Sequence, residues 1–355
     1  MAGKLVRAGV EVLVEAGAGA AAHFEDPEYV AQGVRLTDEK TCLDEADVLL
    51  KVQPPSATEV KKLREGTVLI GLLNPLRNLE LVGLLAERRI TSLALELLPR
   101  ITRAQAMDAL SSQASITGYK AVLLGADRLS KFLPMLTTPT GTIRPAKVLI
   151  IGAGVAGLQA IATAKRLGAM VEAYDVRPET REQCESLGAK FVQVDVSAAG
   201  SGGYARELTA EERARQQEIL GKHVARADLV VTTAAVPGRA SPRIITKEMV
   251  EAMRAGSVII DLAAEGGGNC EVTEPGETNV YADVLVYGPL NVPSMVPYHA
   301  SETYSKNLHN LLLLMVKDGQ LAPDWEDEVL AGALLTRDSE VIAPAVKKLI
   351  EEAAP

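Results

Sequence analysis

The chain has 355 residues, of which 47% are hydrophobic and only 3% aromatic, and its formal net charge at pH 7 is -9. This length predicts about two domains, and the negative charge argues against a nucleic-acid backbone as partner. With so few aromatic side chains, the core must be built mainly from Leu, Val, Ile and Ala, as in α/β proteins with a parallel sheet.

The three cysteines, Cys42, Cys184 and Cys270, are far apart and show no CxxC spacing. They predict a reduced, cytoplasmic compartment and no metal site of the zinc type. The most apolar windows are interrupted well before about 18 residues, and the N-terminus carries no cleavable signal pattern, so no direct membrane insertion is expected.

The N-terminal third of the chain alternates β-branched runs with helical patterns. Four strands are predicted, at Val10–Gly17, Val48–Val52, Thr67–Leu73 and Ser92–Leu98. Helices are predicted at Asp26–Gly33, at Ser56–Gly66 with Ser56 as N-cap, at Asn78–Arg89, and over a long stretch from Thr102 to Leu129.

A Pro-, Thr- and Gly-rich stretch at 132–145 predicts a linker. Six short buried strands follow, and this spacing predicts one complete doubly wound sheet. They are Lys147–Ala153, Met170–Val176, Lys190–Val194, Asp228–Ala234, Ser257–Ala263 and Val284–Gly288. The segment Ser301–Pro355 is predicted to be helical and to pack on the first domain. The expected domains are therefore 1–130 with 305–355, and 131–304.

The strongest chemical signal is VLIIGAGVAGLQ, in which Gly152, Gly154 and Gly157 form a GxGxxG pattern between a strand and an amphipathic helix. Such glycines allow a tight turn, close approach of the backbone to a pyrophosphate, and close packing of helix on strand. The phosphates would lie at the helix N-terminus, beside the backbone of Ala153 and Val155, where free N–H groups and the helix dipole favour an anion.

Asp175 ends the second strand of this unit, 23 residues after Gly152. A carboxylate there accepts from a ribose 2'-hydroxyl and repels a 2'-phosphate, so NAD is favoured over NADP. Val176 and Arg177 follow it, and an arginine near this position sometimes accommodates that phosphate. A purely structural glycine-rich turn is the alternative; strand, helix, spacing and acid together favour the dinucleotide.

Residues for other chemistry are sparse. The sequence has no nucleophile elbow, Walker loop or metal-ligand cluster, and its four histidines are scattered. Lys51 is equally compatible with an anchor for a substrate carboxylate and with a lysine whose stem packs at a strand end. The polar stretch Arg100–Gln113, taken alone, favours a solvated helix face.

Four segments together resemble one family. They are RITRAQAMDALSSQASITGYKAVLLGA, KVLIIGAGVAGLQAIATAKRLGAMVEAYDVR, SVIIDLAAEGGGNCEVTEPG and GPLNVPSMVPYHAS. They resemble the NAD(H)-binding component, domain I, of proton-translocating nicotinamide nucleotide transhydrogenase, and the resemblance covers nearly the whole chain. It implies two Rossmann-like α/β domains, each a mostly parallel sheet with flanking helices, with the NAD cleft between them.

The resemblance also implies roles for the polar stretch. Arg100, Gln105, Asp108 and Ser111 would hold the nicotinamide and its ribose, with Gln105, Asp108 and Arg100 at the catalytic positions. Hydride transfer between two nicotinamides moves no separate proton at the reacting carbons, so the protein must supply positioning.

Further expected contacts with NAD(H) come from four other places. In the family, a mobile loop with a Gly-Gly-Tyr closes over the cofactor, and Gly202, Gly203 and Tyr204 match it; taken alone this stretch is only a flexible surface loop. Gln216 lies on the following helix. Ala235, after the fourth strand of the second domain, should line the adenosine side, and Asn291 belongs to the GPLNVPSM segment.

The partners implied are a second copy of the chain in a homodimer, an NADP(H)-binding subunit and membrane-spanning subunits that move protons. The chain itself would be cytoplasmic, peripheral to the inner membrane through those partners.

Two other functions stay open. An alanine-dehydrogenase-type amino-acid oxidoreductase shares the fold, but that relative has a His after the third strand and an Asp after the strand matching SVIIDLA, where this chain has Asn74 nearby and Glu265. A non-catalytic NAD-binding module is the second.

The family usually opens with a strand and a basic segment, whereas this chain starts at MAGKLVRAGVEVLVEAGAG. Without that strand, weakened folding of the first domain is expected.

Overall fold

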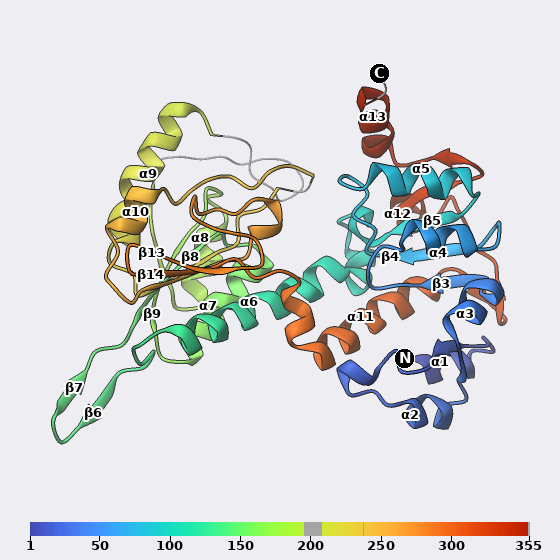
Figure 1. Ribbon diagram of the computed structural model, residues 1–355, viewed down its shortest axis with the longest axis horizontal. Helices are drawn as coiled ribbons and strands as arrows, with labels where there is room; N and C mark the ends of the chain where they lie inside the picture. Colours follow the sequence, from blue (N-terminus) through green and yellow to red (C-terminus); the bar gives the residue numbers. More distant parts are fainter. Residues whose placement is uncertain (195–207, 237, 354–355) are drawn as a thin grey trace. The chain divides into compact units, whose positions relative to one another are not determined.

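The computed structural model describes residues 1–194, 208–236 and 238–353. The chain separates into two compact units, Met1–Gln113 with Pro297–Pro355, and Ala114–Val296 (Figure 1). They are called the first and second unit below. The domain limits expected from the sequence, 1–130 with 305–355 and 131–304, stay a prediction.

The second unit is built on a seven-stranded sheet that contains all six predicted strands. The strand order is β10-β9-β8-β11-β12-β14-β13, and all neighbours are parallel except β13 and β14. The strands are β8 Lys147–Ile151, β9 Met170–Tyr174, β10 Lys190–Phe191, β11 Leu229–Thr232, β12 Val258–Asp261, β13 Thr278–Tyr281 and β14 Val284–Tyr287. The sequence missed β13, an edge strand that buries none of its side chains fully.

Helices cover both faces of this sheet. Successive side chains of β8 point to opposite faces, and each face forms a core with its own helices. Val148 and Ile150 pack with α6, α7 and α8, whereas Leu149 and Ile151 pack with α9 and α10. The helices are α6 Ala109–Arg128, α7 Val155–Arg166, α8 Thr180–Ser186, α9 Ala210–Val224 and α10 Lys247–Glu251. This is the doubly wound α/β arrangement that the sequence predicts.

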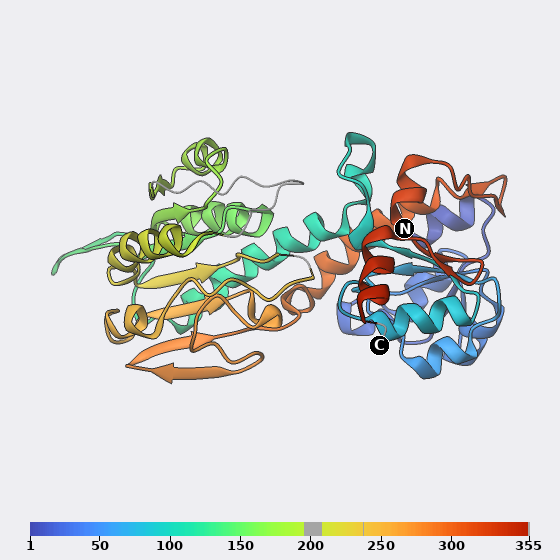
Figure 2. The same ribbon diagram turned by 90° about the horizontal axis from the view of Figure 1, so that it is seen from above.

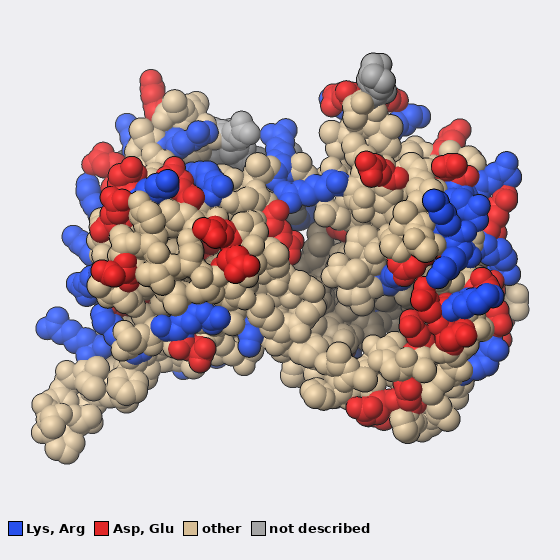
Figure 3. All heavy atoms as spheres, viewed as in Figure 1, with Lys and Arg blue, Asp and Glu red and all other residues tan. Residues whose placement is uncertain are grey.

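The predicted linker at 132–145 is instead a β-hairpin, so that prediction is wrong. Strand β6, Leu136–Thr138, pairs antiparallel with β7, Gly141–Ile143, and the hairpin extends away from the rest of the second unit (Figure 1 and Figure 2). Threonines supply β-branched side chains for the short strands, while Pro139 and Thr140 form the turn. Figure 3 shows acidic and basic side chains intermixed over the visible face of each unit, whereas the hairpin presents none there.

The first unit has a five-stranded sheet in the order β18-β17-β5-β4-β3. Its parallel part is β3 Val48–Leu50, β4 Val68–Gly71 and β5 Thr91–Ala94. The antiparallel edge comes from the C-terminal segment, as β17 Leu334–Arg337 and β18 Glu340–Val341. The expectation that Ser301–Pro355 is entirely helical is therefore wrong. That segment also forms the small hairpin of β15, Val316–Lys317, and β16, Gln320–Leu321.

Helices again flank both faces of this sheet. One core includes α11 Pro297–Leu312, α12 Glu328–Ala333 and the 3-10 helix η3 Thr102–Met107; the other includes α3 Glu39–Glu45, α4 Ala57–Lys62, α5 Leu79–Glu87 and α13 Pro344–Ala353. Helix α4 starts with the predicted cap, because the Ser56 hydroxyl and the Glu59 carboxylate form a reciprocal capping box.

The N-terminal elements form a small substructure beside that sheet. Helix α1, Ala2–Arg7, precedes β1, Leu13–Glu15, and α2, Asp26–Ala31, precedes β2, Arg35–Thr37. Among the described residues, the two strands pair only with each other, in parallel. The predicted strand Val10–Gly17 is thus shorter than expected and lies outside the five-stranded sheet.

The long helix predicted from Thr102 to Leu129 is broken at Asp108. Thr102–Met107 is a 3-10 helix, and α6 begins at Ala109. The Asp108 carboxylate accepts from the backbone N–H of Ser111 at 2.9 Å, which is the N-cap geometry that starts a new helix. The periodicity continues across the break, so it could not reveal the cap.

Candidate functional site

The glycine turn joins β8 to α7 and has the shape that a pyrophosphate needs. Gly152 has φ +97°, which favours glycine, and a Cβ on Gly157 would lie 1.8 Å from the Gly152 carbonyl oxygen. A Cβ on Gly154 would meet nothing within 4 Å. The turn is therefore closed on the protein side and open at Gly154, where α7 presents its free N–H groups. Ala153 is buried in the turn, while Val155 is 41% exposed.

The Asp175 carboxylate lies directly beside this turn. Its Oδ2 accepts from the Ala153 N–H at 2.7 Å and from Arg177 Nη2 at 2.8 Å. Its Oδ1 accepts from the backbone N–H and the Nε of Arg177, each at 2.9 Å. This hydrogen bonding raises the pKa of the Arg177 guanidinium. Asp175 thus links the end of β9 to the glycine turn, while Val176 packs against the core.

The turn lies at the point where the strand order of the sheet reverses, between β8 and β11. Ligands of doubly wound sheets bind at this crossover. Thr233, directly after β11, donates from its hydroxyl to the Gly152 carbonyl at 3.1 Å. The exits of the two strands are therefore in direct contact.

A buried asparagine fixes the exit from β11, and the sequence did not single it out. Asn269 has no exposed surface. Its Oδ1 accepts from the Ala234 N–H at 3.0 Å, and its Nδ2 donates to the carbonyls of Ala234 and Pro242 at 2.7 and 2.9 Å. Ala235, predicted to contact the adenosine side, is the exposed next residue. Only the unusual GGGN run after β12 could have drawn attention to Asn269.

The loop after β12 is organised by Asp261, which is also fully buried. Its carboxylate accepts from the Thr232 and Thr273 hydroxyls at 2.8 and 2.7 Å, and from the backbone N–H of Cys270 at 3.0 Å. Farther along this loop, the Glu265 carboxylate accepts from the Asn291 N–H at 3.2 Å. The predicted site residue Asn291 is exposed and adopts φ +46°.

Gln216 has a partner inside the protein. Its side chain is buried and donates to the Tyr174 hydroxyl at 2.9 Å, and burial raises the pKa of Tyr174 to about 12. This hydrogen bond gives the buried Gln216 amide a partner within the core of the second unit. Gly203 and Tyr204, predicted to belong to a loop that closes over the cofactor, lie outside the described residues.

In the first unit, the segment Arg100–Gln113 combines structural and exposed polar side chains. Arg103 forms an ion pair with Asp327, the N-cap of α12. The Asp108 carboxylate accepts from the backbone N–H of Ser111 and, through Oδ2, from its hydroxyl at 2.5 Å. Arg100 and Gln105 are exposed. Four of the predicted site residues thus lie on this one stretch, and Asp108 caps α6 by accepting from Ser111; they are Arg100, Gln105, Asp108 and Ser111.

Lys51, at the end of β3, is paired with the Glu59 carboxylate, and both side chains are less than a quarter exposed. Its carbonyl oxygen accepts from the Tyr304 hydroxyl at 2.7 Å. After the neighbouring strands β4 and β5, the Glu96 carboxylate accepts from the N–H groups of Asn74 and Leu73 at 2.6 and 3.2 Å. Burial raises the pKa of Glu96.

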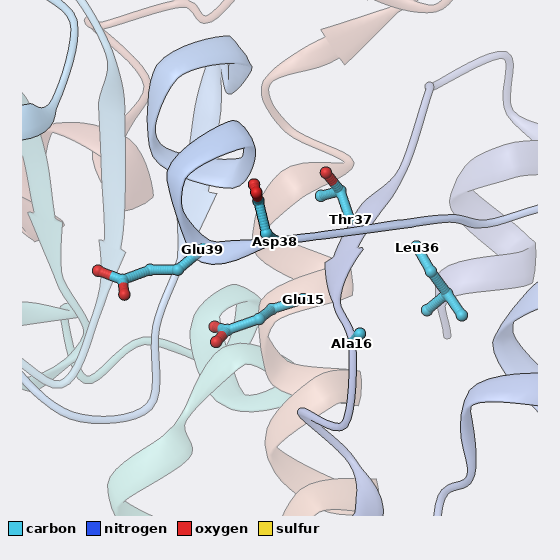
Figure 4. Close-up of a pocket in the computed structure, with 6 residues that line it drawn as sticks. All are labelled: Glu15, Ala16, Leu36, Thr37, Asp38 and Glu39. Carbon is cyan, nitrogen blue, oxygen red and sulfur yellow. The ribbon is translucent and has the colours of Figure 1, made fainter.

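A separate shallow depression on the first unit is lined by three carboxylates, those of Glu15, Asp38 and Glu39 (Figure 4). Asp38 caps α3 by accepting from the Thr41 N–H at 2.8 Å. Within residues 1–194, 208–236 and 238–353, no group of three His, Cys, Asp or Glu side chains is placed to hold a metal ion. Over those same ranges, no helix combines the length and apolar character needed to cross a membrane.

The fold and the glycine turn together define a Rossmann-type α/β protein whose second unit fits a dinucleotide. Family models identify the particular family. The model for "Alanine dehydrogenase/PNT, C-terminal domain" matches residues 121–344, and the one for "Alanine dehydrogenase/PNT, N-terminal domain" matches residues 1–117. The chain belongs to the alanine dehydrogenase/PNT family.

Individual relatives include members of both branches of this family. In Rhodospirillum rubrum, the first of the chains that make up NAD(P) transhydrogenase subunit alpha is 47% identical over 97% of this chain and 92% of that protein. The crystal structure of transhydrogenase from Sinorhizobium meliloti matches with a TM-score of 0.85 and 42% identity, covering 97% of this chain and 93% of that one. Alanine dehydrogenase 2 of Staphylococcus aureus is 31% identical over 98% of this chain and 90% of that protein.

Proposed function

We propose that this chain is the NAD(H)-binding subunit of a proton-translocating transhydrogenase. It passes hydride between its own NADH and NADP+ held on a partner subunit, and separate membrane subunits couple this transfer to proton movement. The observation that carries the proposal is the junction of Asp175 with Ala153, at 2.7 Å, in a glycine turn that is open at Gly154. The relatives named as transhydrogenase subunits support the choice among NAD-dependent reactions.

The second unit supplies a site for the pyrophosphate and the adenine ribose. The free N–H groups at the start of α7 favour the two phosphate charges. The Asp175 carboxylate accepts from a ribose hydroxyl, in exchange for part of its contact with Arg177, and it repels the 2'-phosphate of NADP(H). Val155, Ala235 and Asn291 offer exposed surface for the remaining parts of the cofactor.

The first unit supplies positioning of the reacting ring. Bound NADH is the source of the hydride. Gln105 is exposed on η3 and can donate and accept hydrogen bonds at the nicotinamide carboxamide or ribose. Asp108 and Ser111 fix the start of α6 next to it, and Arg100 completes the set. None of these side chains has to transfer a proton, because transfer between two nicotinamides needs orientation alone.

The contacts of Lys51 argue against the alanine-dehydrogenase-type alternative. An amino-acid oxidoreductase needs a cation for the substrate carboxylate, but Glu59 already neutralises the Lys51 ammonium. The strand exit at Asn74 and the loop at Glu265 also lack the His and Asp expected of that enzyme.

The proposal includes the assembly. We expect a homodimer, which is the commonest symmetric form, together with an NADP(H)-binding subunit and membrane-spanning subunits. The chain would then lie in the cytoplasm, peripheral to the inner membrane. No metal is required of it.

A stopped-flow absorbance experiment tests the function. The full chain is loaded with NADH and mixed with the isolated NADP+-loaded domain of a transhydrogenase, and hydride transfer is followed. A fast burst that requires both proteins supports the proposal. Bound NADH without transfer contradicts it. Reduction of pyruvate in the presence of ammonia would then identify an alanine-type enzyme, and its absence a non-catalytic NAD-binding module.

A further inference from the structure

Helix α11 holds the η3 segment through one backbone carbonyl. Asn307 and Asn310, one turn apart on α11, both donate from Nδ2 to the Ala106 carbonyl oxygen, each at 3.0 Å. Ala106 lies directly after Gln105 and belongs to the last turn of η3. Carbonyls in the last turn of a helix lack partners within that helix, so an outside donor fixes their direction.

The two asparagines differ in burial and in their other contacts. Asn307 is 7% exposed, whereas Asn310 is only partly buried. The Oδ1 of Asn307 also accepts from the Ser112 hydroxyl at 2.7 Å. The Ala106 carbonyl can only accept, so the amide nitrogen of Asn307 must face it and the amide oxygen must face Ser112. This chemistry fixes the orientation of the amide group.

Asn307 therefore joins the two sides of the break at Asp108. It contacts η3 at Ala106 and the first turn of α6 at Ser112, while Asp108 between them has a non-helical ψ of 88°. At the other end of η3, Arg103 is tied to Asp327. The backbone that carries Gln105 is thus held at both ends, and the position of that backbone determines where the exposed Gln105 side chain points.

We propose that Asn307 is a positioning residue for the nicotinamide: it sets the η3 backbone so that Gln105 faces the ring. The inference deepens the proposed function and rests on it. A buried amide with two specific bonds preorganises such a segment, because water cannot replace those bonds. Asn310 makes the same bond at a more accessible place, where water can take over as donor.

The test compares Asn307→Asp with Asn310→Asp in the full chain. Asn307→Asp keeps the shape and the acceptor for Ser112, but it replaces the donor to the Ala106 carbonyl with an oxygen. Single-turnover transfer from saturating NADH to the NADP+-loaded partner domain should fall by at least about tenfold, equivalent to a 1.4 kcal/mol higher barrier. The dissociation constant of NADH should stay within about threefold, because the phosphate and ribose contacts are unchanged. Asn310→Asp should match the wild type in both.

Two further readouts need no partner protein. The fluorescence of bound NADH reports the surroundings of the reduced nicotinamide, and amide hydrogen exchange reports the backbone of residues 102–112. Both should change in Asn307→Asp and not in Asn310→Asp. Should Asn307→Asp fail to fold, Ser112→Ala removes the other bond of the same amide and should change the same two signals.

The proposed function and the positioning role of Asn307 can be contradicted by different results. Absence of hydride transfer in the wild type overturns the proposed function, and the fluorescence and exchange measurements still decide the role of Asn307. A folded Asn307→Asp or Ser112→Ala variant with wild-type fluorescence and wild-type exchange overturns the inference. A variant that only melts earlier, with an unchanged transfer rate, does so as well.

Discussion

The Asp175 carboxylate accepts a hydrogen bond from the backbone N–H of Ala153 at 2.7 Å. This single bond ties the end of β9 to the turn between β8 and α7. The carboxylate is 6% exposed and also bonds to Arg177. One side chain thus shapes the glycine turn and offers the acceptor by which NAD would be distinguished from NADP.

Asp175→Asn should weaken NADH binding and narrow the preference for NADH over NADPH. The amide loses the charge that pairs with Arg177, and its nitrogen cannot accept from Ala153. We expect NADH affinity to fall by at least about tenfold, while NADPH affinity falls less because the repulsion of its 2'-phosphate is removed. Fluorescence titration with both nucleotides measures the two affinities. Asp283→Asn, at an exposed turn with φ +59°, is the control; equal losses for both nucleotides in Asp175→Asn would contradict the assignment.

Substitution by alanine should affect different properties at two glycines of this turn: stability at Gly157 and NADH affinity at Gly154. Gly157→Ala puts a methyl group 1.8 Å from the Gly152 carbonyl oxygen, so we expect a loss of about 3 kcal/mol in the free energy of unfolding. Gly154→Ala meets only open space and should change stability by less than about 1 kcal/mol. Its methyl group occupies the place proposed for the phosphates, so NADH affinity should fall. Urea unfolding and NADH titration separate the two effects, and a Gly154→Ala variant with full affinity would place the phosphates elsewhere.

The sheet of the second unit was predictable because its strands are short, buried on both faces and separated by helices. Apolar runs such as Val258–Asp261 and Leu229–Thr232 identify such strands directly. The exposed edge strand β13 and the hairpin at 136–143 carry no such signal. In the C-terminal segment, Leu334–Arg337 becomes a strand only because β5 offers it a partner, a contact between residues far apart in the chain.

The geometry of the glycine turn was also predictable from the sequence, whereas its use as a binding site stays a prediction. The motif located Gly152, Gly154, Gly157 and Asp175, since their spacing reflects a local turn. Asn269 and Asn307 were missed, because each acts through bonds to distant backbone groups and neither belongs to a local pattern. The hydrogen bond from Asn307 to Ala106 spans 201 positions, and sequence periodicity gives no information about it.

Asn269→Ala should destabilise the second unit and loosen the exit from β11. The side chain is fully buried and makes bonds to Ala234 and Pro242. Its removal leaves buried backbone groups without partners, and we expect a loss of about 3 kcal/mol in the free energy of unfolding. NADH affinity should fall too, because Ala235 follows the released residue.

Asn279→Ala is the matched control for that change. Asn279 donates to the Val272 carbonyl at 2.8 Å, but its buried Oδ1 has no partner among the described residues. Because that unpaired oxygen is itself unfavourable, its removal should cost less than removal of Asn269. Denaturant unfolding followed by far-UV circular dichroism compares the two variants. Equal losses would mean that the bonds of Asn269 contribute little beyond packing.

Glu96 should make the stability of the chain depend on pH in the direction opposite to that of a paired carboxylate. Its oxygens accept from the N–H groups of Asn74 and Leu73, yet burial raises its pKa above the ordinary 4.5. The folded protein therefore binds this proton more tightly than the unfolded chain does. Its contribution to the free energy of unfolding is most favourable below pH 4.5 and declines as pH rises through the higher folded-state pKa.

Glu96→Gln removes this titration, so the variant should gain stability relative to the wild type as pH increases from below 4.5 to neutrality. The gain should level off once the wild-type carboxyl is fully ionised. Urea unfolding at a series of pH values measures the difference. Glu87→Gln, an exposed change at the end of α5, should show a much flatter difference. The opposite result is a wild type that becomes more stable than Glu96→Gln as pH rises. It would mean that the hydrogen bonds from Asn74 and Leu73 outweigh the cost of burial, so that ionised Glu96 stabilises the ends of these strands.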